Sequence, residues 1–225
     1  MDLVKPLKIG LIMAISAFAL MLTAAITVIT SQCAYSMRIS NTLTSGLMKD
    51  FTTARWEEWG IPDFIMAFPP CTDLANSGSR HWAKKRLENP SFQDEAADTC
   101  RIAADIADYF GVPYMIENPV GKLSTLWRKP DYTFHPCDYA GYLPEDDKHP
   151  DFPDIIPARD RYFKKTCLWT GNGFVIPPRA LILPKEEDKD NPGWAKTGGK
   201  SSRTKMIRSL TPRGFARAVF ESNSK

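Results

Sequence analysis

Two short apolar runs on either side of an amphipathic helix pattern constrain the fold of this chain most strongly. Residues 64–68 (FIMAF) stop at a Pro-Pro pair, and residues 112–116 (VPYMI) follow a glycine. Between them, apolar residues in 91–110 recur at steps of three and four, as in a helix with one buried face, with Ser91 placed to cap it and Gly111 to end it. The order strand, loop, helix, strand predicts one βαβ unit of a parallel sheet.

Residues that can carry chemistry follow both predicted strands. Cys71 comes just after Pro69 and Pro70, and Glu117 and Asn118 close the second strand. Because the carboxyl ends of parallel strands meet at one edge of an α/β sheet, Cys71 and Glu117 are expected to share a site. A cysteine nucleophile and a carboxylic acid that keeps a ring nitrogen protonated suit attack on a flipped base. The alternative is that Cys71 is a small buried hydrophobic residue.

The length of 225 residues predicts one main domain, and the net charge of +3 is too small to indicate a nucleic-acid partner by itself. The distribution of charge is more informative, because residues 191–220 contain seven basic side chains and no acidic one. This basic C-terminal segment favours contact with a phosphate backbone, with a solvated surface as the alternative. Its basic residues are Lys196, Lys200, Arg203, Lys205, Arg208, Arg213 and Arg217.

The cysteine pattern indicates a reducing compartment and no metal site. The five cysteines, at positions 33, 71, 100, 137 and 167, include no CxxC pair and no regular spacing, which argues against a disulfide framework or a zinc ribbon. Cys100 and Cys167 lie in apolar patterns and are expected in the core. His135, Cys137 and His149 match no standard zinc spacing, and the residues after Cys71 do not form the P-C-x-x-C of a zinc deaminase.

The N-terminal segment 1–36 contains 22 residues without a charge, from 9 to 30, which is long enough for a transmembrane helix. Three explanations stay open: a membrane anchor, a cleaved signal, or a segment foreign to the domain through a displaced start or a rearranged gene. A linker is expected over 37–50 and the main domain over 51–225. We expect that domain to be cytoplasmic, with membrane contact possible through residues 9–30.

The second half of the domain combines irregular and regular segments. Residues 129–160 are rich in Pro, Tyr, Asp and His without a period and predict a loop-rich insert. Residues 166–170 predict a strand that a Gly-Asn-Gly turn closes. Near the C-terminus, Thr211 is expected to cap a helix with Pro212 at its first position.

Residues 67–71 (AFPPC) resemble the proline-cysteine nucleophile loop of the DNA cytosine-C5 methyltransferase family, and residues 116–119 (IENP) resemble its Glu-Asn motif. The spacing between the two motifs is also similar to that of the family. The resemblance implies that Cys71 attacks C6 of cytosine and that Glu117 contacts N3 and the exocyclic amine. Asn118 would then brace the cysteine loop.

A closer resemblance extends from residue 63 to the C-terminus. The strings FPPCTDLANSGSRHW, PYMIENPVGKLSTLWRKPDYTFHP, KKTCLWTGNGF and RSLTPRGFA are similar to a phage and prophage family described as DNA cytosine methyltransferase-like. The Arg-Asp-Arg at 159–161 lies where the cytosine-C5 methyltransferase family carries a pair of arginines that contact base or backbone, and the RSLTPR at 208–213 resembles the late R-x-L-T-x-R element of that family. The DNA-binding residues implied in this way, together with the basic C-terminal segment, are Arg159, Arg161, Lys200, Arg203, Lys205, Arg208 and Arg213.

The family resemblance also implies S-adenosyl-L-methionine as the methyl donor, held by a strand and a glycine-rich turn that precede the cysteine. No such turn occurs before residue 64, where Gly46 and Gly60 stand alone, so only the loop at Pro69 and Pro70 is a candidate contact to the donor. The expected fold is therefore an α/β methyltransferase-type (Rossmann-like) parallel sheet without its first two or three strands. Three functions stay open: a DNA cytosine-C5 methyltransferase, an inactive DNA-binding remnant, and a membrane-anchored protein with a methyltransferase-like scaffold.

Overall fold

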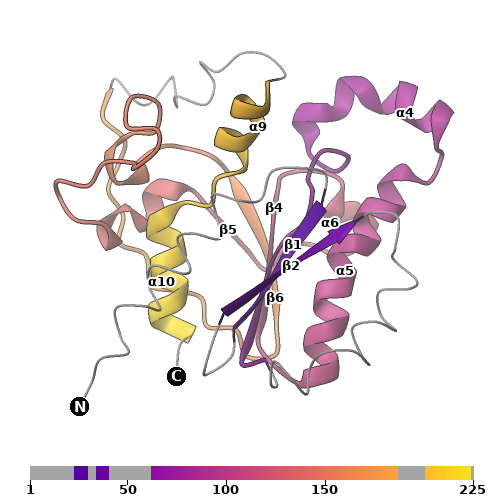
Figure 1. Ribbon diagram of the computed structural model, residues 1–225, viewed down its shortest axis with the longest axis horizontal. Coiled ribbons are helices and arrows are strands. Elements are labelled where there is room, and N and C mark those ends of the chain that lie inside the picture. Colours follow the sequence, from indigo (N-terminus) through magenta and orange to yellow (C-terminus); the bar gives the residue numbers. More distant parts are fainter. Residues whose placement is uncertain (1–22, 30–33, 41–61, 187–200, 224–225) are drawn as a thin grey trace. The chain divides into compact units, whose positions relative to one another are not determined.

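The computed structural model describes residues 23–29, 34–40, 62–186 and 201–223 (Figure 1). The strands are β1 (Thr23–Ile29), β2 (Ala34–Ser40), β3 (Phe64–Phe68), β4 (Tyr114–Pro119), β5 (Tyr132–Phe134) and β6 (Thr166–Gly171). The α-helices are α4 (Trp82–Glu88), α5 (Phe92–Phe110), α6 (Leu123–Leu126), α9 (Ser202–Ser209) and α10 (Arg213–Asn223), and the 3-10 helices are η1 (Asn76–His81), η2 (Pro136–Tyr142) and η3 (Ala158–Asp160).

The chain divides into two compact units, each described by itself. The sheet unit contains the described residues of 21–133 and 166–174, and the insert unit contains those of 134–165 and 175–225. The strands form one mixed sheet in the order β2-β1-β3-β4-β6-β5. The neighbours β3 and β4 are parallel, whereas β1 pairs antiparallel with both β2 and β3, and β6 pairs antiparallel with β4.

The mixed α/β character was predicted, but the sheet is mostly antiparallel where a parallel sheet was expected. Strand direction depends on the path by which the chain returns to the sheet, and apolar patterns within a strand carry no record of that path. The short connection between β1 and β2 allows only an antiparallel pair, because a parallel pair needs a crossover of a dozen residues or more.

The apolar N-terminal segment differs from the helix expected over residues 9–30. Residues 23–29 (TAAITVI) form β1, and five of these seven residues are β-branched, a side-chain shape that favours strands over helices. Residues 9–22 and 30 lie outside the described residues. Part of the expected linker, residues 37–40, belongs to β2, and the rest of 37–50 also lies outside. No helix within the described ranges combines the length and apolar character that crossing a membrane requires.

The predicted βαβ unit is confirmed as β3, α5 and β4, with Ile65 opposite Tyr114 and Ala67 opposite Ile116 in parallel register. Gly111 ends α5 in the left-handed conformation, with φ of 65°. Ser91 occupies the N-cap position, but its side chain makes no capping hydrogen bond. The entry to α5 is organised instead by Asn89, whose Oδ1 accepts from the backbone N–H of Ser91 at 3.0 Å.

The core of the sheet unit lies between α5 and the strands. Ile65, Ile116 and Trp169 are buried there, and the Trp169 indole N–H donates to the carbonyl of Arg128 at 2.7 Å. Cys100 on α5 and Cys167 on β6 belong to the same core, as predicted. Each fully buried side chain of leucine or isoleucine size contributes about 1.5–3 kcal/mol, so this core is the main source of stability for the strands that carry the site.

The insert unit contains residues 134–160 of the predicted loop-rich insert and packs around aromatic rings. Phe134 stacks on Phe215 with ring centroids 4.1 Å apart, and Tyr139 contacts both rings. At Gly214 a Cβ would lie 2.3 Å from the Tyr139 carbonyl oxygen, so only glycine allows α10 this close to η2. Helix α10 begins at Arg213, one residue later than expected, because the carbonyl of Pro212 already accepts the first helical hydrogen bond, from Ala216 N–H.

Candidate functional site

Strands β3 and β4 end next to each other at one edge of the sheet. Their parallel register pairs Ala67 with Ile116, so Glu117, near the end of β4, lies at the same edge of the sheet as the loop that carries Cys71 after β3. Cys71 is exposed, while Cys100, Cys137 and Cys167, the other cysteines in the described ranges, are buried. The alternative that Cys71 is a buried hydrophobic residue is therefore wrong, because its side chain faces solvent.

Asn118 connects the end of β4 to the cysteine loop. Its side chain is fully buried, and its Nδ2 donates to the carbonyl of Pro69 at 3.2 Å. The loop then makes a tight turn in which the Cys71 carbonyl accepts from the N–H groups of Leu74, at 3.1 Å, and Ala75, at 2.8 Å. The hydrogen bond and the turn hold the backbone on both sides of Cys71.

The loops that follow β3 and β4 also bind each other. The N–H of Lys122 donates to the Leu74 carbonyl at 2.8 Å, and the N–H of Asn76 donates to the Val120 carbonyl at 3.1 Å. A Cβ on Gly121 would lie 1.9 Å from the Leu74 carbonyl oxygen, so a larger residue would push the loops apart. The sequence interpretation missed Gly121, and its only signal was a glycine two residues after the Glu-Asn-Pro string.

The pKa of the buried Cys100 thiol responds to the charges at this site. Burial raises the pKa of the Cys100 thiol to about 12, the Arg101 guanidinium partly opposes this, and the negative charges of Cys71 and Glu117 raise the pKa further. Cys71 and Glu117 therefore both lie within electrostatic reach of one buried group. At neutral pH Cys100 is an uncharged thiol, and Cys71 is the accessible sulfur at this edge.

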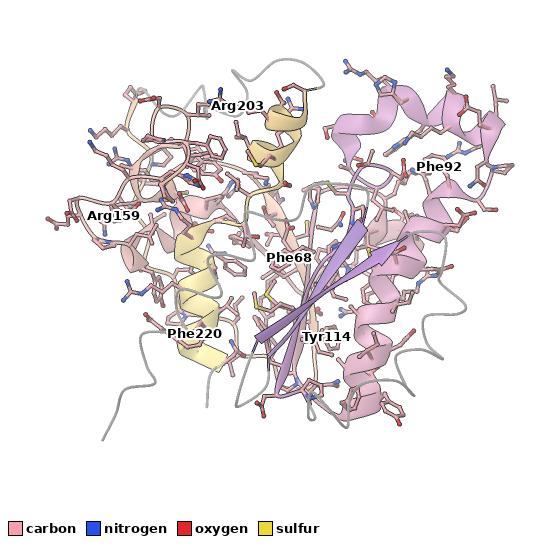
Figure 2. The ribbon with its side chains drawn as sticks, viewed as in Figure 1. Phe68, Phe92, Tyr114, Arg159, Arg203 and Phe220 are labelled. Atoms are coloured by element: carbon pink, nitrogen blue, oxygen red, sulfur yellow. The ribbon has the colours of Figure 1, made fainter. Side chains whose placement is uncertain are left out.

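The predicted DNA-binding arginines occupy different environments within the insert unit. Arg203, labelled in Figure 2, and Arg208 are exposed. The Arg203 guanidinium lies 5.9 Å from the centre of the Phe152 ring. Arg159 is half-buried, and its Nε donates to the Ala140 carbonyl at 3.2 Å. Arg161 is half-buried as well. Lys196 and Lys200 lie outside the described residues, as does the side chain of Lys205.

Arg213 is buried rather than displayed to DNA. Its guanidinium donates to Asp147 at 2.7 and 2.9 Å and to Asp160 at 2.8 Å. Burial by itself lowers the pKa of Arg213, but the hydrogen bonds and charges of the two carboxylates raise it above its ordinary value. The expectation that Arg213 meets DNA is corrected, because its donors are already bound inside the protein.

The described residues do not fit a site for S-adenosyl-L-methionine of the kind implied by the family resemblance. That site needs a second parallel strand, with a glycine-rich turn, on the side of β3 away from β4, and the strand on that side is the antiparallel β1. Of the two glycines near this edge, Gly121 packs on the Leu74 carbonyl and Gly78 lies in η1. Within the same ranges, no three His, Cys, Asp or Glu side chains are grouped so as to hold a metal ion.

Comparison with known proteins assigns no family to this chain. No protein-family model matches the chain, and no curated protein matches it.

Proposed function

We propose that this chain is a DNA cytosine-C5 methyltransferase-like protein with Cys71 as its nucleophile. The observation that carries the proposal is an exposed cysteine whose loop is braced by a fully buried Asn118, at the edge to which a parallel strand brings Glu117. These residues resemble the nucleophile loop and Glu-Asn motif of that family. The proposal includes a methyltransferase-type sheet that lacks its first strands.

In the proposed chemistry, the Cys71 thiolate adds to C6 of a cytosine that has left the base stack. Glu117 in its acid form keeps N3 protonated, so the electrons of the opened double bond collect at C5 and make this carbon nucleophilic. Asn118 holds the Pro69 carbonyl and with it the position of Cys71. S-adenosyl-L-methionine supplies the methyl group in the family that the sequence resembles.

A second candidate is a DNA-binding protein whose Cys71 attacks C6 of the flipped base but which has no methyl donor. The antiparallel pairing of β1 with β3 favours it, because β1 stands where the donor's strand would be needed. The cysteine loop and Glu117 are unaffected by that pairing. The two candidates therefore share the attack on C6 and differ in the transfer of a methyl group.

Two readouts on the full chain separate the candidates. The first is transfer of a radioactive methyl group from S-adenosyl-L-methionine to DNA, and the second is exchange of the C5 hydrogen of cytosine for deuterium without a donor. Exchange follows from the same attack: the C6 adduct takes a deuteron at C5, loses the original proton, and releases the thiolate.

The matched variants are Cys71→Ser and Thr72→Ala, since both positions are exposed neighbours in one loop. Methyl transfer that Cys71→Ser abolishes and Thr72→Ala retains supports the methyltransferase. Exchange without transfer supports the second candidate. If the wild type shows neither, Cys71 is not a nucleophile toward cytosine and both proposals are wrong.

A further inference from the structure

The segment that follows the cysteine loop carries a concentration of positive charge. Residues 76–88, which form η1 and α4, contain Arg80, Lys84, Lys85 and Arg86 and a single acidic residue, Glu88. No side chain of η1 or α4 is buried. This segment belongs to the sheet unit, like Cys71 and Glu117.

Helix α4 is tied to the cysteine loop through Asp73. Lys85 of α4 forms an ion pair with the Asp73 carboxylate, and Gln93 of α5 donates to the Asp73 carbonyl at 3.0 Å. Arg86 in turn donates to the side chain of Gln93 at 3.1 Å. In Figure 2, Phe92 marks the start of α5, directly after the end of α4. Asp73 lies two residues after Cys71, so these contacts fix the position of α4 relative to the cysteine loop.

The loop after Glu117 and Asn118 holds the other end of α4. The ammonium group of Lys122 lies 5.8 Å from the centre of the Trp82 ring, the first residue of α4. The backbone N–H of Lys122 also binds the Leu74 carbonyl of the cysteine loop. Both loops of the candidate site therefore position the same helix.

Leu87 stands out on this helix because 87% of it is exposed, the largest value among the large exposed hydrophobic side chains in the described part of the chain. A membrane surface would need several apolar residues along one face, but the other exposed side chains of α4 are charged or small. Proteins that bind the minor groove of DNA combine basic side chains with apolar ones, leucine among them, that they insert as wedges between base steps. The exposed side of α5 carries Asp94, Asp98 and Asp105, which repel phosphates and leave the α4 side for DNA.

We propose that η1 and α4 form the DNA-contacting surface of the candidate site, where Arg80, Lys84 and Arg86 bind phosphates and Leu87 enters the base stack beside the flipped cytosine. This inference rests on the proposed function. An extruded base leaves a gap in the stack, and a wedge in that gap offsets part of the cost of unstacking. The contacts of Asp73 and Lys122 with α4 fix the position of Leu87 relative to Cys71.

The wedge is tested with the full chain and a DNA duplex that carries 2-aminopurine beside a cytosine, because this probe brightens when its neighbour leaves the stack. The wild type should raise the fluorescence, Leu87→Ala should reduce the rise at least threefold, and Leu87→Met should restore it. Tyr109→Ala is the matched control, since Tyr109 is also a large exposed side chain of the sheet unit and should leave the signal unchanged. A Leu87→Ala signal equal to that of Tyr109→Ala would overturn the wedge.

The phosphate contacts are tested by the salt dependence of binding, measured by fluorescence anisotropy. Each lost phosphate contact lowers the slope of log K against log salt by about 0.9. Arg80→Ala and Lys84→Ala should each show this loss, and Lys129→Ala, which removes an exposed charge from the same unit, should not. Equal slopes for all three variants, or no binding by the wild type at low salt, would overturn the inference. Leu87-dependent unstacking without methyl transfer or exchange would retain this surface and reject the proposed chemistry.

Discussion

Replacing Arg213 with methionine removes a cation that holds two carboxylates inside the insert unit. Arg213 is 8% exposed and Asp160 is 2% exposed. The guanidinium binds Asp160 Oδ1 at 2.8 Å and both oxygens of Asp147, while the Arg213 backbone N–H binds Asp160 Oδ2 at 2.6 Å. Methionine keeps the backbone bond and similar volume but leaves the Asp160 carboxylate buried without its counter-charge.

Loss of one partner from a buried ion pair costs about 3–5 kcal/mol, because the remaining charge stays away from water. A fall of that size is a large part of the total stability of about 5–15 kcal/mol that is typical of a domain. Arg217→Met is the matched control on the same helix. Its exposed pair with Glu221 spans one helical turn, and such pairs contribute about 0.3–0.5 kcal/mol.

Urea unfolding followed by far-ultraviolet circular dichroism at pH 7 measures both changes. Arg213→Met should lower the midpoint far more than Arg217→Met, and Arg213→Met combined with Asp160→Asn should recover part of the loss because the stranded charge is gone. If Arg213→Met unfolds at the same urea concentration as Arg217→Met, the buried network does not stabilise the unit, and Arg213 returns as a candidate DNA contact.

Three further outcomes follow from the described contacts. Asn118→Ala should lower the free energy of unfolding by about 1–3 kcal/mol, because the buried carbonyl of Pro69 loses its donor; an unchanged urea midpoint would contradict this. At pH 8 an aromatic disulfide reagent should label Cys71 in the folded protein and Cys100 only after unfolding, so Cys71→Ser should lose one labelled thiol from the native count. The free energy of unfolding should decrease as the pH falls below about 6.5, and the decrease should be smaller in His149→Asn. Urea midpoints at pH 7.5 and 5.5 measure this difference.

The direction of each pH effect follows from the state that binds protons more tightly. Burial raises the pKa of Cys100 from its ordinary 9.0 to about 12, so from pH 9 upward the unfolded thiol ionises first and the stability contributed by the folded thiol is lost. Burial, and next the charge of Arg213, lower the pKa of His149 below its ordinary 6.5. As pH falls through 6.5 the unfolded imidazole therefore takes a proton first, and folding weakens. Asparagine retains an acceptor for the N–H groups of Asp151 and Phe152 without titrating.

The sequence by itself determined the βαβ unit and the meeting of its strand ends. The three- and four-residue period of α5, the glycine that ends it and the prolines after β3 are local signals, since each depends on the conformation of a few neighbouring residues. Parallel strands on either side of a helix then bring Cys71 and Glu117 to one edge for purely topological reasons. The burial of Cys100 and Cys167 followed from the same local periods.

Only the tertiary structure decided the features that depend on distant partners. The pattern of residues 23–29 suits a buried helix or a strand, and pairing with β2 and β3 selects the strand. Arg213 looked like part of a basic surface because its carboxylate partners are more than fifty residues away along the chain. Gly121 is required by a carbonyl of another loop. Apolar periodicity reports which face of an element is buried, whereas strand direction, charge pairing and close backbone approach are set by contacts that no local pattern contains.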